Sequence, residues 1–166
     1  YGDFTNRGVS TWVDSRAPSG MCRRRIFIAT IDARLIALDA RTGVACANFG
    51  VSGTVDLRKG LRIAPFEFQA YQQTSPPAVV GDVIVVGSSI ADNSRSDPAS
   101  GEIRGYDART GALKWTWDPI PQDRRNPGYD TWDSGTMRMG AANAWTVLTA
   151  DPARDLVFVP TSSPAP

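Results

Sequence analysis

The sequence contains no histidine among its 166 residues. This absence excludes a Ser-His-Asp or Cys-His nucleophile within the chain, because both systems need an imidazole base. It also excludes zinc sites that depend on histidine, and the two cysteines present cannot form a closed thiolate site by themselves. A metal ion bound by this chain should therefore have oxygen ligands.

The sequence also lacks an excess of either charge and any long apolar run. Its 18 basic and 17 acidic residues leave a net charge of +1, whereas nucleic-acid binders usually show a clear basic excess. We therefore expect no nucleic-acid partner, and we interpret the basic run at residues 23–25 as a solvated strand edge. No apolar run approaches the roughly 18 residues that span a bilayer, so membrane association is expected only through parts outside this chain.

Short β-branched and aromatic runs predict an all-β chain, and no window shows the apolar stripe of an amphipathic helix. The turn chemistry of Gly81-Asp82 predicts a hairpin, and another is predicted around residues 32–33. Long loops, where binding residues tend to lie, are expected at residues 50–73 and 118–140. Strands are predicted over residues 25–30, 34–39, 78–80, 83–87, 102–107, 113–117 and 156–160.

The pentapeptide Asp-Ala-Arg-Thr-Gly occurs at residues 39–43 and again at 107–111, each time at the end of a predicted strand. Asp and Thr side chains can accept hydrogen bonds from nearby backbone N–H groups, and Gly can adopt a positive φ, so both copies predict the same tight turn. A long repeat built from β-hairpins favours a β-propeller with insertions, although a β-sandwich with two similar turns is the alternative. Trp115 follows the second copy, where its ring can pack between blades and its N–H can bind an adjacent backbone.

The two cysteines flank the first predicted hairpin. Cys22 precedes it and Cys46 follows it, which places them nearly opposite each other at its base. A disulfide there is geometrically plausible and would indicate an oxidising compartment. Two unrelated buried thiols are the alternative, and the spacing does not match a Cys-x-x-Cys redox pair.

Four segments in order resemble the quinoprotein dehydrogenases, eight-bladed β-propellers that use pyrroloquinoline quinone with calcium. Residues 107–115 resemble the family's tryptophan-docking repeat, and the resemblance as a whole extends from Asn6 to Pro166. It implies that residues 1–166 are the N-terminal portion of such a propeller, roughly two to three blades with long loops. The other resembling segments are residues 6–10, 74–93 and 142–152.

The resemblance implies a cofactor role for each residue that matches a family motif. Arg7 would pair with a cofactor carboxylate or quinone oxygen, since a planar guanidinium can bind such groups in bidentate fashion. Thr74 and Ser89 would donate hydroxyl hydrogen bonds to the cofactor carboxylates. Asn143 would bond the cofactor rim, and Trp145 would form the floor on which the tricyclic quinone stacks.

The resemblance also implies a metal site and a reaction. Asp92 would ligate calcium and Asn93 could supply a second oxygen, so that the ion polarises the quinone carbonyl for hydride acceptance. The substrate would be a sugar or polyol, glucose-like, with a respiratory quinone or another acceptor receiving the electrons. The family's catalytic aspartate lies further downstream, so no residue up to Pro166 is assigned as the base and the piece alone should be inactive.

Departures from the alcohol-oxidising branch favour the membrane-bound glucose dehydrogenase branch. Tyr1 and Gly2 stand where the alcohol branch has adjacent cysteines. Asp3 stands where the sugar branch has a histidine, and Ser163 stands where the alcohol branch has an asparagine metal ligand, so neither is given a role.

The beginning and end of the chain and its resemblance give further expectations. The chain starts without Met and stops in a Ser/Pro-rich stretch, so both ends are interpreted as truncated. The whole protein is expected in the periplasm, with a possible inner-membrane anchor before Tyr1. The alternatives are a quinate, shikimate or alcohol quinoprotein dehydrogenase, or a non-catalytic propeller scaffold such as those of outer-membrane assembly.

Overall fold

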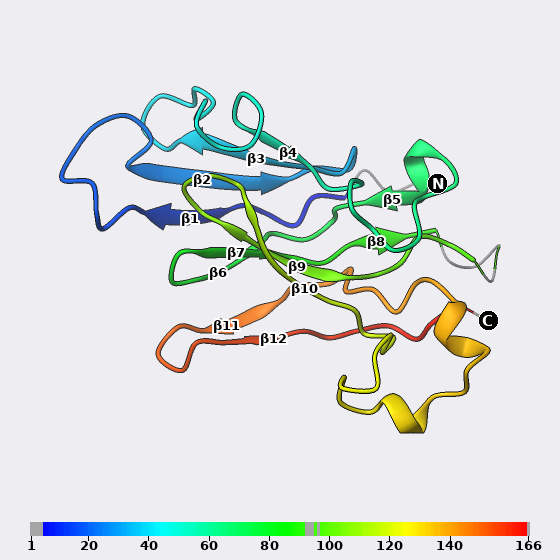
Figure 1. Cartoon of the computed structure of the whole chain (residues 1–166). Helices are drawn as coiled ribbons and strands as arrows, with labels where there is room; N and C mark the ends of the chain where they lie inside the picture. Colours follow the sequence, from blue (N-terminus) through cyan, green and yellow to red (C-terminus); the bar gives the residue numbers. More distant parts are fainter. Residues whose placement is uncertain (1–4, 92–94, 96, 166) are drawn as a thin grey trace.

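Two four-stranded antiparallel sheets form most of the computed structural model, which describes residues 5–91, 95 and 97–165 (Figure 1). The first sheet has the order β1-β2-β3-β4. Its strands are β1 (Ser10–Val13), β2 (Arg24–Ala29), β3 (Arg34–Asp39) and β4 (Thr54–Asp56).

Alternating burial fixes the face that the first sheet turns inward. Phe27 pairs with Ala37 and Ala29 pairs with Leu35, and all four side chains are buried. Because side chains alternate across a strand, directly opposed residues share one face, so these pairs build a continuous apolar layer. The hairpin predicted around residues 32–33 is confirmed.

The second sheet has the order β10-β9-β7-β6, and it contains the hairpin predicted at Gly81-Asp82. Its strands are β6 (Ala78–Val80), β7 (Val83–Val86), β9 (Ile103–Asp107) and β10 (Leu113–Trp117). Two shorter ribbons pair β5 (Tyr71–Gln72) with β8 (Ser89–Ile90), and β11 (Thr149–Asp151) with β12 (Leu156–Phe158). Among the described residues, the helical turns are all 3₁₀: η1 (Phe68–Ala70), η2 (Tyr129–Thr131) and η3 (Thr136–Arg138).

The sheets follow one another as propeller blades do. In each four-stranded sheet the strands are spatially ordered as they occur in the sequence. The first strands β1, β6 and β11 lie together, with β6 between the other two (Figure 1). The described residues therefore form two four-stranded blades and a two-stranded hairpin of a third, which confirms the all-β propeller prediction over the β-sandwich.

The repeated pentapeptide forms the same turn in both blades. Asp39 Oδ1 accepts hydrogen bonds from the N–H groups of residues 41 and 42 and from the Thr42 hydroxyl. Asp107 Oδ1 accepts the three matching bonds in the second blade. Gly43 and Gly111 both have a φ of 73°, a left-handed conformation that favours glycine. The turn chemistry predicted from the repeat is confirmed.

The tryptophan that joins the first two blades is Trp12, which the sequence analysis missed. Its indole N–H donates to the Gly81 carbonyl in the second blade at 3.1 Å. Arg109 and Arg25 place their guanidinium carbons 4.9 and 5.8 Å from the centre of its ring. Trp115, the tryptophan predicted to pack between blades, covers Gly105 on the neighbouring strand of its own sheet, is 39% exposed and lines the space between the second blade and the β11–β12 hairpin.

A disulfide joins Cys22 to Cys46, with their Cα atoms 5.8 Å apart, which decides between the two alternatives left open by the sequence. Both cysteines are buried at the base of the first blade. The Cys22 N–H donates to Asp39 Oδ2 at 2.5 Å, so the disulfide loop is tied to the first repeated turn.

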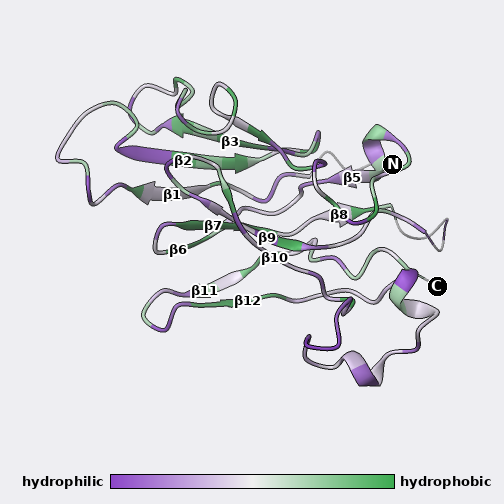
Figure 2. Cartoon of the chain, viewed as in Figure 1, coloured by the Kyte–Doolittle hydropathy of each residue, from purple (hydrophilic) through white to green (hydrophobic). Residues whose placement is uncertain are grey.

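One apolar core runs between the two blades. It combines Phe27 and Leu35 from the first sheet with Ile84, Val86 and Tyr106 from the second. Figure 2 shows hydrophobic residues on strands such as β3 and β7 and hydrophilic residues in the long loop after β10. Within the described residues, no helix has the length and apolar character needed to cross a bilayer.

Candidate functional site

Residues from two distant segments of the sequence converge on the main chain of Trp145. Its carbonyl oxygen accepts hydrogen bonds from Thr74 Oγ1 at 2.9 Å and from Ser75 Oγ at 2.7 Å. Arg7 Nη1 approaches the same oxygen at 3.4 Å and also donates to the Thr74 carbonyl at 3.1 Å. The structure thus brings together three of the residues that the resemblance assigns to the cofactor, namely Arg7, Thr74 and Trp145.

The Trp145 ring combines an apolar surface with a nearby cation. The side chain is 49% exposed, and the Arg7 guanidinium carbon lies 5.6 Å from the ring centre. An exposed aromatic face can stack on a flat conjugated ring, and an adjacent guanidinium can pair with an anionic substituent of that ring. The arrangement therefore suits a flat, negatively charged ligand.

Ser89 lies on the short β5–β8 ribbon, where it pairs with Gln72. Thr74 lies two residues beyond β5, where its carbonyl accepts the Arg7 N–H at 3.1 Å. Gly87 lies against the Ala144 carbonyl, which a Cβ at this position would overlap. The missing side chain therefore lets the segment that carries Trp145 approach the ribbon.

Asn143 is buried and both ends of its side-chain amide are bonded within the protein. Its Nδ2 donates to the Ser88 carbonyl at 2.7 Å, and its Oδ1 accepts from Ser162 Oγ at 2.9 Å. Asn143 is 1% exposed, and the Ser88 N–H donates to the Ala144 carbonyl at 2.9 Å. The structure therefore places the Asn143 amide between the Ser88 and Ser162 segments, which it joins.

A second polar network, which sequence reasoning missed, ties three long loops together near this end of the blades. Arg62 Nε donates to Asp118 Oδ2 at 2.7 Å, and the Arg62 N–H donates to Glu102 Oε1 at 2.7 Å. Burial raises the pKa of Asp118 above its usual value, while the Arg62 guanidinium opposes that shift. Charged residues in Gly/Pro-rich loops carry no periodic signal, so only the tertiary structure reveals their pairing.

The predicted metal ligands Asp92 and Asn93 lie outside the described residues. Within the described ranges, no group of three or more Asp, Glu, Cys or His side chains is close enough to hold a metal ion. Ser163 is exposed and its carbonyl accepts the Ala142 N–H at 3.1 Å. The metal assignment therefore stays a prediction.

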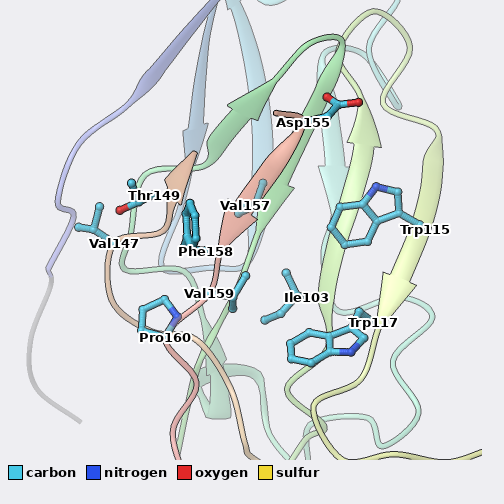
Figure 3. Close-up of a pocket in the computed structure, with 10 residues that line it drawn as sticks. All are labelled: Ile103, Trp115, Trp117, Val147, Thr149, Asp155, Val157, Phe158, Val159 and Pro160. Carbon is cyan, nitrogen blue, oxygen red and sulfur yellow. The ribbon is translucent and has the colours of Figure 1, made fainter. Parts of the chain in front are cut away.

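A separate cavity of about 920 Å³ lies between the second blade and the β11–β12 hairpin. Figure 3 shows Trp115 and Trp117 on one side of it and Val157, Phe158 and Val159 on the other. Asp155 is its only charged lining residue in the part of the chain that the structure describes. This surface has the apolar composition of an inter-blade face and lacks the converging donors found around Trp145.

The family model of the glucose/ethanol/alcohol dehydrogenase β-propeller domain, which uses PQQ (pyrroloquinoline quinone), matches residues 1–166. The chain belongs to this family. The quinate/shikimate dehydrogenase (quinone) of Acinetobacter baylyi is 40% identical over 154 residues, which cover 93% of this chain and 18% of that protein. The glycerol dehydrogenase large subunit of Gluconobacter oxydans is 41% identical over 162 residues, which cover 96% of this chain and 21% of that subunit. The chain thus spans about a fifth of the length of these curated relatives.

The solved structures confirm the architecture of this PQQ propeller chain. The quinohemoprotein alcohol dehydrogenase from Comamonas testosteroni superposes with a TM-score of 0.70 at 25% identity. The similarity covers 99% of this chain and 22% of that enzyme. The two blades and the third hairpin are therefore one section of a larger propeller fold.

Proposed function

We propose that this chain is the N-terminal portion of a propeller domain whose whole protein oxidises a hydroxyl group of a sugar or polyol, glucose-like, with pyrroloquinoline quinone as cofactor and Ca²⁺ as its metal. The observation that carries the proposal is the convergence of Arg7, Thr74 and Ser75 on Trp145 within a PQQ-family propeller. Family membership gives the cofactor class, and the arrangement of these side chains supports the place where it binds.

The residues present fit the cofactor. Pyrroloquinoline quinone is a flat tricyclic tricarboxylate, and the half-exposed Trp145 ring offers an apolar face of suitable shape. Arg7 supplies a positive charge beside that ring, and Thr74, just after β5, and Ser89, on β8, would supply hydroxyl donors. When bound, the cofactor supplies the hydride acceptor, and Ca²⁺ beside it supplies Lewis acidity.

The protein residues then bind and orient rather than react. Trp145 would exclude water from one face of the ring, and Arg7 would hold a negatively charged edge by charge-assisted hydrogen bonds. Asp92 and Asn93 would supply oxygen ligands to Ca²⁺, a hard cation that prefers such ligands. No base is assigned within residues 1–166, so we expect this piece to be inactive alone.

The names of the relatives support the proposed substrate class. The family name includes glucose and alcohols, and the two relatives described above are named for quinate or shikimate and for glycerol. Most of these compounds carry several hydroxyl groups, which supports a polyhydroxylated substrate. Quinate or shikimate is the second candidate, and the 40% identity to the Acinetobacter enzyme favours it over a simple alcohol.

The cellular setting is a further part of the proposal. The Cys22–Cys46 disulfide is consistent with an oxidising compartment, and we propose the periplasm. Electrons would pass to a respiratory quinone or another acceptor, as the name of the quinate/shikimate relative suggests for that enzyme. Any membrane anchor would belong to parts of the whole protein outside this chain.

The proposal is tested by dye-coupled oxidation with the full-length apoprotein. Glucose, glycerol and quinate are each supplied with pyrroloquinoline quinone, in the presence and absence of Ca²⁺. We expect turnover of at least one substrate, dependent on both additions. Asp92→Ala should abolish the Ca²⁺-dependent activity, whereas Asp97→Ala, in the same loop and ion-paired with Arg95 on the surface, should leave it unchanged.

Each outcome of that assay has a distinct meaning. Oxidation of quinate but not of glucose would support the enzyme class and identify the second candidate as the substrate. Equal activity of Asp92→Ala and the unsubstituted protein would refute the metal assignment. Silence with every substrate, together with no binding of the cofactor, would refute the enzyme proposal and leave a non-catalytic propeller.

A further inference from the structure

The Trp145 carbonyl is held by side-chain hydroxyl groups rather than by a strand partner. Residues 142–145 belong to no strand, and the next strand, β11, begins at Thr149. The Trp145 carbonyl accepts hydrogen bonds from Ser75 Oγ at 2.7 Å and Thr74 Oγ1 at 2.9 Å, and the preceding Ala144 carbonyl accepts the Ser88 N–H at 2.9 Å. The backbone bond thus holds the residue before Trp145, and the two hydroxyl groups hold the peptide group that follows its indole.

The Trp145 carbonyl oxygen is approached by three donors, two hydroxyls and one guanidinium, but it can accept only two strong hydrogen bonds. A carbonyl oxygen has two lone pairs, and the longest of the three contacts is the 3.4 Å approach of Arg7 Nη1. The two hydroxyls thus make the main hydrogen bonds to the Trp145 carbonyl, and the Arg7 guanidinium can still donate to another acceptor.

Ser75 differs from Thr74 in having no assigned role toward the cofactor. It precedes Pro76, which restricts its backbone to extended conformations. Its hydroxyl makes the shortest of the three contacts with the Trp145 carbonyl, and the motifs that assign a cofactor role to Thr74 assign none to Ser75. The Ser75 hydroxyl can therefore serve the Trp145 carbonyl while Thr74 serves the cofactor.

We infer that Ser75 is a positioning residue, which keeps Trp145 in place when Thr74 turns its hydroxyl toward a bound carboxylate. The inference rests on the proposed function, because it takes pyrroloquinoline quinone as the ligand above Trp145. A hydroxyl has only one proton to donate, so Thr74 cannot hold the Trp145 carbonyl and donate to the cofactor at once. Ser75 supplies the second proton that both tasks together require.

The test measures cofactor affinity of the full-length apoprotein, independent of turnover. Titration with pyrroloquinoline quinone, followed by quenching of intrinsic fluorescence, gives the dissociation constant. Loss of one hydroxyl–carbonyl bond predicts a rise of about three- to tenfold for Ser75→Ala. Ser75→Thr should stay near the unsubstituted value, because it restores the hydroxyl. Thr131→Ala removes an equivalent hydroxyl–carbonyl bond in the exposed loop after β10 and should change nothing.

Two further variants separate positioning from general stability. In a Trp145→Phe background, which keeps the carbonyl but replaces the indole, Ser75→Ala should raise the dissociation constant less than it does alone. Ser75→Cys keeps the shape of serine with a weaker donor, and it should give an intermediate affinity even if the alanine variant folds poorly.

The outcomes distinguish this inference from the proposed function. Failure of the unsubstituted protein to bind the cofactor would refute the proposed function itself. Tight binding by the unsubstituted protein, with unchanged affinity in Ser75→Ala or Ser75→Cys, would overturn the role of Ser75 alone. An equal loss for Ser75→Thr and Ser75→Ala would also overturn it, because the hydroxyl would then not be the cause.

Discussion

Substitution of Trp12 by phenylalanine tests whether one indole joins the first two blades. The change removes the N–H that donates to the Gly81 carbonyl at 3.1 Å while keeping a ring in the buried position. A hydrogen bond of this kind contributes about 0.5–1.5 kcal/mol net. The weaker cation–π attraction of phenylalanine for Arg109 and Arg25 adds about 0.5 kcal/mol. We expect the contact between the blades to lose about 1–2 kcal/mol.

The assay is hydrogen exchange of the full-length protein, because it reports on local opening. A loss of about 1–2 kcal/mol predicts amide exchange roughly 5- to 30-fold faster at the turn between β6 and β7. Peptides covering β11 and β12, on the other side of the second blade, should exchange as before. Trp117→Phe, at a 45% exposed ring, is the matched control and should change protection little. Unchanged exchange at the β6–β7 turn in Trp12→Phe would refute the reasoning.

Three further predictions concern stability. Replacing Cys22 and Cys46 together by alanine should destabilise the protein by about 3–4 kcal/mol, since the disulfide closes a loop with a sequence separation of 24. Urea unfolding of the unsubstituted protein, with and without a reductant, and of the double variant measures this loss. Equal unfolding midpoints for the oxidised unsubstituted protein and the double variant would contradict it. Hydrogen bonds to the Asp39 carboxylate, above all the one from the Cys22 N–H, lower the pKa of Asp39 to about 2. The ionised carboxylate should therefore stabilise the fold above the pKa of aspartate in the unfolded chain, near 4, and this stabilisation should be lost as the pH falls toward 2. Unfolding midpoints across this range should fall less steeply in Asp39→Asn. Gly105→Ala should cost about 1–3 kcal/mol, because a Cβ would overlap the Trp115 indole, and a thermal midpoint equal to that of the unsubstituted protein would show that the ring moves aside freely.

The strands and turns of the two blades could be predicted because their signals are local. Alternating apolar residues placed β2 and β3, and turn chemistry placed the hairpin at Gly81. The strands that the sequence analysis missed, such as β4 and β8, have three and two residues. Runs that short carry too few alternating positions to be separated from loops, and their pairing partners decide their conformation.

The tryptophans show the limit of reasoning from an offset. The spacing after the second repeat indicated Trp115, which faces the β11–β12 hairpin, but it gave no sign of Trp12, whose indole N–H reaches the Gly81 carbonyl in the second blade. The Gly81 carbonyl and the Arg25 and Arg109 guanidinium groups, which contact the Trp12 indole, all belong to other segments of the chain. The sequence around Trp12 therefore does not reveal its role.

The sequence by itself determined the all-β class, the repeated turn and the exclusion of histidine chemistry, because composition and short-range hydrogen bonding act within a few residues. Family resemblance named Arg7, Thr74 and Trp145 as cofactor residues. Only the tertiary structure shows that Arg7 and Thr74, which lie 138 and 71 positions from Trp145 in the sequence, both reach its carbonyl oxygen. The same holds for Ser75, whose part in the site depends on where the segment before β11 lies. Contacts at such separations form only when blades pack face to face, and that packing is a property of the whole fold.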